Sequence, residues 1–256
     1  MTPCTIPFSF GGIKMEENFD KFDEYVMKYD MKDHMIAYKY NHSYRVMHQA
    51  EEICRSLEMD TVERDLASFI SLFHDIARFK QWTEYKTFND SKSFDHGDEG
   101  EKILFEEGLI NELNVSEEDY DVIRKAIRNH NKYHIEEGLN ERELLHSKIV
   151  RDADKIDILY AFSTQRLLEL KEDDTEISDA VNEDYFNHES TDCTNYKGKN
   201  DRLVGLFSLV FDINYDYSKQ RILNENYIEK IYAGLKNKKL FKKYKDEAIK
   251  YLKGEI

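Results

Sequence analysis

Proline, glycine and cysteine are scarce in this sequence of 256 residues. It contains 2 prolines, Pro3 and Pro7, and 10 glycines. Proline is the strongest helix breaker, and both prolines lie near the start, so the rest of the chain is free to form helices. The sequence therefore predicts a mostly helical protein.

The 3 cysteines do not form a recognisable disulfide or zinc pattern. Cys4, Cys54 and Cys193 are odd in number, widely spaced and without a CxxC pair, which favours a reducing, cytoplasmic location. The stretch through Gly12 lacks the basic and apolar segments of an export signal. No apolar run approaches the ~20 residues that a membrane-spanning helix needs.

Positive charge is also in short supply. The chain has 37 Lys and Arg against 52 Asp and Glu, a formal net charge of −15. It lacks the basic field that attracts nucleic-acid polymers and anionic membranes, so we expect neither as a partner, and any phosphate chemistry must be local. Despite 35% charged residues, the 17 Tyr, 15 Phe and 40% hydrophobic content predict a folded core.

Apolar residues recur every three or four positions over most of the chain, which predicts an all-α fold. The expected helices cover 15–29, 33–59, 61–79, 96–107, 117–131, 141–171, 202–213 and 224–252, with a short segment at 180–186. Residues 80–95 show no period and predict a long ordered loop. We divide the chain into an N-terminal segment and packing helix (1–30), a catalytic core (31–165) and a helical C-terminal extension packed on the core (166–256).

Histidines and aspartates fall on several of these helices. An adjacent His and Asp on the apolar helix 61–79 would be costly unless their polar atoms were compensated, and a metal ion is one such compensation. Imidazole and carboxylate ligands suit Mn, Fe, Co, Ni or Zn, and one carboxylate can bridge two ions. The candidates, which five helices could bring to one site, are His42, His74, Asp75, His96, His130 and Asp154.

Three phrases carry a resemblance to a known family. HSYRV (42–46), FHDIARF (73–79) and DADKID (152–157) resemble, in order, the signature of the HD-domain superfamily of metal-dependent phosphohydrolases. The resemblance covers about residues 36–165 and implies an all-α bundle. It also implies that His42, His74, Asp75 and Asp154 hold a metal ion, with Asp154 rather than Asp152 as the ligand.

Two further phrases resemble the binuclear branches of that superfamily. They are HGDEG (96–100) and IRNH (127–130), and they imply that His96 and His130 hold a second ion while Asp75 bridges the two. The expected cofactor is thus one or two divalent transition-metal ions per chain, with Mg possible. The GYP phrase and the Glu-Asp pair that follows HD are absent, which disfavours cyclic-dinucleotide and alarmone substrates.

The resemblance implies hydrolysis of a small phosphoester, a nucleotide or related metabolite, by attack of a metal-bound hydroxide. The expected catalytic residues are Asp75, Arg78, His134 and Lys155, and the expected substrate-binding residues are Arg45, Arg78, Lys80 and Lys92. His134 is assigned as an acid because it lies four residues after His130. A surface salt bridge remains an alternative for Arg78, and an ion pair that braces a nearby acid remains one for Arg45. Alternative functions are a mixed-valent di-iron oxygenase and a non-catalytic nucleotide or metal sensor.

Overall fold

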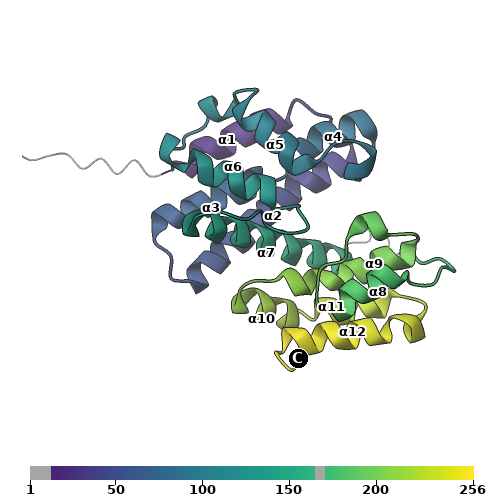
Figure 1. The fold of residues 1–256 in the computed structure, drawn as a ribbon. Helices are drawn as coiled ribbons and strands as arrows, with labels where there is room; N and C mark the ends of the chain where they lie inside the picture. Colours follow the sequence, from purple (N-terminus) through teal and green to yellow (C-terminus); the bar gives the residue numbers. More distant parts are fainter. Residues whose placement is uncertain (1–12, 165–170) are drawn as a thin grey trace, which may run out of the picture.

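The computed structural model describes residues 13–164 and 171–256, and these ranges are all-α with no strand, as predicted (Figure 1). Cys4, both prolines, residues 165–170 of the expected helix 141–171 and the expected boundary at 165/166 lie outside the described residues; residue 171, the expected end of that helix, is described and is not helical. The longer helices are α1 (Met15–Val26), α2 (His34–Ser56), α3 (Thr61–Phe73), α4 (Ala77–Tyr85), α5 (His96–Phe105), α6 (Tyr120–Asn129), α7 (Glu141–Thr164), α8 (Asp179–Phe186), α9 (Lys199–Ser208), α10 (Asp216–Asn224), α11 (Tyr227–Gly234) and α12 (Lys238–Leu252). Short 3-10 turns include η1 (Asp90–Lys92), η3 (Glu117–Asp119) and η5 (Leu209–Asp212). Of the described helices, none combines the length and apolar character required to cross a membrane.

One apolar cluster holds α1 and α3 to α6 together. Every residue of α3 from Leu66 to Phe73 is buried, as its wide apolar band predicts. Phe22 of α1 packs edge-on against Phe73, with ring centroids 5.4 Å apart. The side chain of Asp60 accepts a hydrogen bond from the backbone N–H of Glu63 and caps the start of α3. Helix α3 is therefore the centre of this part of the molecule.

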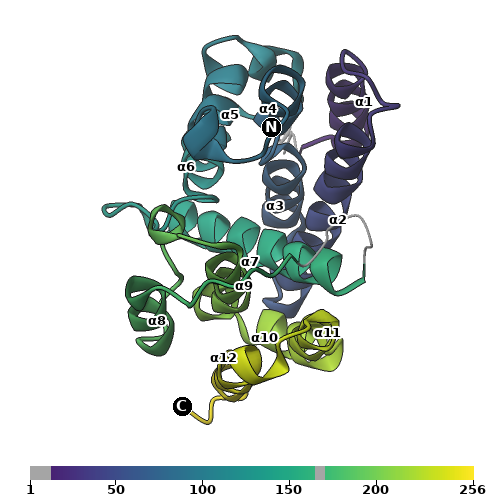
Figure 2. The same cartoon turned by 90° about the vertical axis from the view of Figure 1, so that its right-hand side faces the viewer.

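A second apolar cluster joins α2 and α7 to the C-terminal helices. It contains Ile53 of α2 and Ile156 of α7 together with Val204, Ile231 and Phe241 from the later helices. In Figure 2 α7 runs across the middle of the molecule, with α1 and α4 to α6 on one side and α8 to α12 on the other. The C-terminal region thus shares an apolar core with α2 and α7.

The expected continuous helix over 61–79 is wrong. Helix α3 ends at Phe73 and α4 begins at Ala77, with a turn over 74–76. The imidazole Nδ1 of His74 lies 2.7 Å from the carbonyl oxygen of Ser71, where it competes with the backbone bonds of a continuing helix. The break places His74 and Asp75 in the turn between the two helices.

The expected loop over 80–95 is only partly present, because α4 continues to Tyr85. Gln81 is buried, and the indole N–H of Trp82 donates to Asp33 at 2.9 Å. These tertiary contacts stabilise a helix whose apolar periodicity is weak. Residues 86–95 do form a loop, which contains η1.

The C-terminal helices also differ from the expected pattern. The helix expected over 224–252 is divided into α11 and α12, because the backbone of Leu235 is extended, with φ −77° and ψ 150°. Helix α10 was not predicted, since its apolar residues are few; Ile222 is buried. The expected helix over 202–213 begins earlier, at Lys199, and its last part is the 3-10 turn η5.

Candidate metal centre

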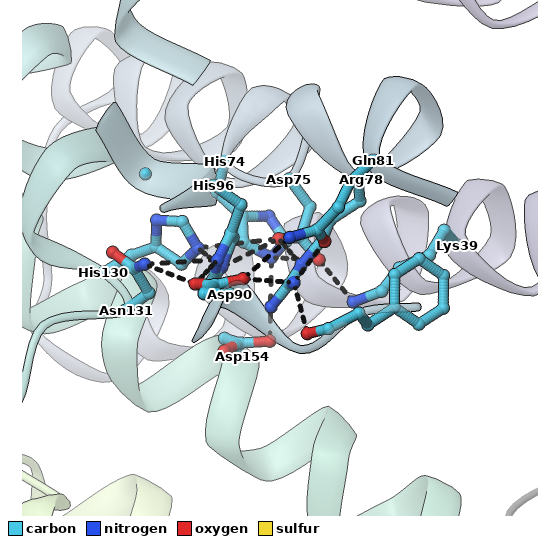
Figure 3. Close-up of polar contacts among 12 residues, drawn as sticks. Lys39, His74, Asp75, Arg78, Gln81, Asp90, His96, His130, Asn131 and Asp154 are labelled. Atoms are coloured by element: carbon cyan, nitrogen blue, oxygen red, sulfur yellow. Dashed lines mark hydrogen bonds and ion pairs between the residues drawn. The ribbon is translucent and has the colours of Figure 1, made fainter. Parts of the chain in front are cut away.

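The structure brings all six expected ligands to one place between the helices. They come from α2 (His42), the turn between α3 and α4 (His74 and Asp75), the first residue of α5 (His96), the residue after α6 (His130) and α7 (Asp154). The four histidines and Asp75 are buried, whereas the side chain of Asp154 is 15% exposed. Figure 3 shows His74, Asp75, His96 and His130 pointing toward one another, with Asp154 reaching in from α7. Together they form the candidate metal centre.

Asp75 lies between two sets of histidines. Its Oδ2 lies 3.3 Å from Nε2 of His42 and 3.5 Å from Nε2 of His74. Its Oδ1 lies 3.5 Å from Nε2 of His96 and 3.5 Å from Nε2 of His130. Each set of two histidines and Asp75 could hold a metal ion. The two sets share one carboxylate, one oxygen to each.

Asp154 belongs to the first of these sets. Its Oδ1 lies 3.1 Å from Nε2 of His42 and 3.6 Å from Nε2 of His74. The Nε2 atoms of His42 and His74 are buried without a hydrogen-bond partner. A buried polar atom without a partner is costly, and a metal ion would provide one for both nitrogens and the facing carboxylates. The ligand types and their burial fit a divalent transition metal.

The opposite nitrogen of each imidazole is held by the protein. The Nδ1 atoms of the four histidines lie 2.7 Å from Asp157 Oδ2 (His42), 2.7 Å from Ser71 O (His74), 2.5 Å from Asp90 Oδ2 (His96) and 2.6 Å from Ile127 O (His130). Such contacts orient the ring and leave Nε2 as the ligand atom, which is the usual arrangement around metal-binding histidines. The supports come from both backbone and carboxylate oxygens.

Charges around the centre keep the carboxylates ionised. Burial alone would raise the pKa of Asp75, but the Lys39 ammonium and the neighbouring histidines outweigh burial and hold this pKa well below its usual value. Burial and Lys39 likewise oppose protonation of His42, yet the facing carboxylates of Asp154, Asp157 and Asp75 raise its pKa to about 10. For His96 burial dominates and lowers the pKa to about 3. Without metal, the positive charges of Lys39 and His42 therefore compensate the carboxylates of Asp75 and Asp154.

Arg45 lies on the side of His42 that faces away from Asp75. Its guanidinium donates to both oxygens of Asp157, from Nε at 2.7 Å and from Nη2 at 2.9 Å, and Asp157 in turn contacts His42. This matches the ion pair that the sequence left open as an alternative to substrate binding. Arg45 therefore braces the carboxylate that orients His42, a candidate metal ligand.

Arg78 connects the metal centre to the loop after α4. Its Nε lies 3.5 Å from Oδ1 of Asp75, and its Nη1 donates to the Phe88 carbonyl at 2.8 Å and to Asp90 Oδ1 at 2.9 Å. Asp90 also contacts His96, so it bridges Arg78 and a ligand. The structure thus brings Arg78 to the centre, where the sequence predicted a phosphate-binding role for it.

Three lysines expected at the site have other surroundings. Lys80 pairs with Glu99 at 2.6 Å. Lys92 is exposed in η1. Lys155 is buried, but its Nζ lies 2.6 Å from Asp212, because consecutive residues of a helix point in different directions. The placement of these lysines does not support direct roles at the centre.

His134 cannot act through the helical spacing from which its role was inferred. Helix α6 ends at Asn129, so no helical face continues from His130 to His134. The His134 side chain is exposed, and its ring packs against Tyr133 with centroids 4.2 Å apart. The predicted position beside His130 is wrong for this reason.

Two residues at the centre were missed by the sequence analysis. Lys39 Nζ lies 2.5 Å from Asp75 Oδ2, and its place one helical turn before His42 could have indicated it. Asp90 lies in a loop without periodicity, so no sequence signal pointed to its contact with His96. Both carry charge to the immediate surroundings of the ligands.

A comparison with protein-family models identifies the family of the region that holds these residues. The family model described as HD domain matches residues 40–159, a range that contains all six ligands. The chain contains an HD domain. The resemblance to this superfamily is thereby confirmed, and its members are typically metal-dependent hydrolases. No curated protein and no solved structure matches the chain.

Proposed function

We propose that this HD domain holds two divalent metal ions and hydrolyses a small phosphoester. The observation that carries the proposal is the position of Asp75, whose two oxygens face two separate pairs of histidine Nε2 atoms. In this assignment His42, His74 and Asp154 would hold one ion, His96 and His130 would hold the other, and Asp75 would offer one oxygen to each. Mn, Fe, Co, Ni and Zn suit these ligands best, and Mg is a further candidate.

The protein side chains would position the substrate and balance its charge. When bound, two such ions supply an activated water and a strong positive charge beside the phosphoryl group. Arg78 adds a guanidinium held rigidly by the Phe88 carbonyl and Asp90. Arg45 and Asp157 keep His42 in a ligating orientation. The side chains thus prepare the site before substrate arrives, which is the main source of electrostatic catalysis.

The proposed substrate is a small phosphorylated metabolite, with nucleotides as the first class to test. The net charge of −15 disfavours polymeric nucleic acid. Trp82 and Phe88 contact each other with ring centroids 5.0 Å apart, and Trp82 also donates to Asp33. These contacts support a role in anchoring the loop, so the phosphoryl group rather than a base carries the proposed recognition.

Release of hydrolysis products by the metal-loaded protein, separated by chromatography, tests the proposal. The substrates are nucleoside mono-, di- and triphosphates, other phosphomonoesters and phosphodiesters, each assayed with Mn, Co, Ni and Zn in turn. Asp75→Ala is the matched control, because loss of the shared carboxylate should remove both metals and turnover. We expect release from at least one class by the wild type and none by the variant.

Two other outcomes would overturn the proposal. Oxygen consumption by the ferrous protein with an organophosphonate or a polyol, without phosphate hydrolysis, would identify a di-iron oxygenase. Tight nucleotide binding without turnover under every metal condition would identify a sensor.

A further inference from the structure

The ammonium group of Lys39 occupies a position that the proposed reaction has not used. Lys39 lies on α2, three residues before His42, and its Nζ is 2.5 Å from Oδ2 of Asp75. Its side chain is 12% exposed, so the charge sits at the edge of the centre and not in bulk solvent. In Figure 3 Lys39 approaches Asp75 from the side opposite His130.

Lys39 and the first metal ion would share one carboxylate oxygen. The Oδ2 atom that contacts Lys39 is also the one that faces Nε2 of His42 and His74. A divalent ion bound to Oδ2 would repel the ammonium, since two positive charges a few ångströms apart in a buried site are unfavourable. With metal bound, Lys39 is stable in this position only beside an additional anion.

A phosphoryl oxygen is the anion that the surroundings of Lys39 fit. Lys39 Nζ and Arg78 Cζ lie 5.3 Å and 5.6 Å from the ring centroid of Phe88. The two cations approach different oxygens of Asp75: Lys39 contacts Oδ2, and Arg78 Nε lies 3.5 Å from Oδ1. Arg78 Nε is buried without a hydrogen-bond partner. Two positively charged donors therefore flank the shared carboxylate, and one has a free N–H.

We propose that Lys39 is a substrate-binding residue that exchanges Asp75 for a phosphoryl oxygen of the substrate once the metals are bound. Before metal binds, its ammonium neutralises Asp75; afterwards it binds the phosphoryl group together with Arg78. This inference rests on the proposed phosphohydrolase function. It requires that metal and phosphate strengthen each other's binding, because phosphate relieves the repulsion between Lys39 and the ion.

The test compares Lys39→Met with the wild type in two binding measurements by calorimetry. The first is the affinity of the metal-loaded protein for inorganic phosphate, and the second is the affinity of the metal-free protein for Mn or Co without phosphate. Loss of a charge-assisted hydrogen bond should weaken phosphate binding roughly ten- to hundred-fold. Metal binding should become tighter, because the competing ammonium is gone. General damage to the fold would weaken both.

Two variants provide the controls. Lys39→Arg keeps the charge and should retain most of the phosphate affinity. Lys125→Met makes the same change of charge at a lysine that pairs with Glu136, and it should leave both affinities unchanged. Lys39→Gln replaces the methionine variant if the latter does not fold, as judged by circular dichroism.

Two results separate this inference from the proposed function. If the metal-loaded wild type does not bind phosphate, the proposed function itself fails. If the wild type binds phosphate and Lys39→Met binds it equally well, the function stands and the role of Lys39 is overturned. Tighter metal binding together with weaker phosphate binding in Lys39→Met supports both the role of Lys39 and the proposed function.

Discussion

Arg151 and Asp212 form an ion pair that joins α7 of the HD domain to the η5 turn of the C-terminal region. Nη2 of Arg151 lies 2.5 Å and Nε lies 3.0 Å from Oδ2 of Asp212. Nη1 of Arg151, which is buried, also donates to the carbonyls of Asn129 at 2.5 Å and Lys132 at 2.7 Å. These carbonyls lie on either side of His130, a proposed metal ligand, in the sequence. One guanidinium therefore connects the C-terminal region to the second set of ligands.

Asp212→Asn should lower the stability of the whole chain. The carboxylate of Asp212 balances Arg151 and also Lys155, whose Nζ lies 2.6 Å away. Removing one partner of a buried ion pair leaves charges uncompensated, and we expect the free energy of unfolding to fall by about 3 kcal/mol. Urea unfolding followed by circular dichroism measures the change. The exposed Asp174→Asn serves as a control and should have little effect, so equal losses in both variants would contradict this role for Asp212.

The same ion pair predicts a dependence of stability on pH. Burial alone would raise the pKa of Asp212, but Lys155 and Arg151 outweigh burial and hold it below the ordinary value of 3.8. A carboxylate whose pKa is lowered by folding stabilises the protein above the unfolded pKa and loses this contribution as pH falls. The difference in unfolding free energy between wild type and Asp212→Asn should therefore be constant at neutral pH and shrink below about pH 4. A difference that stays constant through acid unfolding would contradict the assignment.

The meeting of the expected ligands at one place was predictable because most of these residues lie in short phrases that need no tertiary information. His42, the His74-Asp75 pair and Asp154 each belong to such a phrase, and the structure brings them within contact distance. The directions of His74 and Asp75 were not predictable in this way. They depend on the break between α3 and α4, where the His74 side chain takes the place of a backbone hydrogen-bond partner of Ser71. Apolar periodicity does not predict such a contact.

Residues that support the ligands from a distance were harder to predict. Asp90 reaches His96 from a loop that Arg78 and Gln81 of α4 contact through Asp90 itself. Asp212 meets Arg151 across 61 residues of sequence, and local patterns do not show contacts of that range. The sequence therefore predicts the chemistry of the centre better than it predicts what positions the centre.

Asp157→Asn should weaken metal binding without removing any ligand. Asp157 accepts from Arg45 and contacts Nδ1 of His42, so an amide there would disturb both the orientation and the basicity of the imidazole. Changes of this kind typically cost roughly ten- to hundred-fold in metal affinity. Competition with a metal-binding dye measures the affinity. Arg45→Lys keeps a positive charge beside Asp157, so it should lower the metal affinity less than Asp157→Asn does. An equal or larger loss in Arg45→Lys would contradict the proposal that Arg45 acts on His42 through Asp157.

His96→Ala should reduce the metal content from about two ions per chain to about one, as the proposed two-metal centre requires. His96 belongs only to the second set, together with His130 and the shared Asp75, and so its loss leaves the first set intact. Elemental analysis of protein purified without chelator measures the content, and His48→Ala, at a side chain that is 64% exposed, is the matched control. One equivalent in both the wild type and His96→Ala would confine the metal to the first set. His96 and His130 would then be structural or substrate-binding residues, and a di-iron oxygenase would be excluded because it needs both ions.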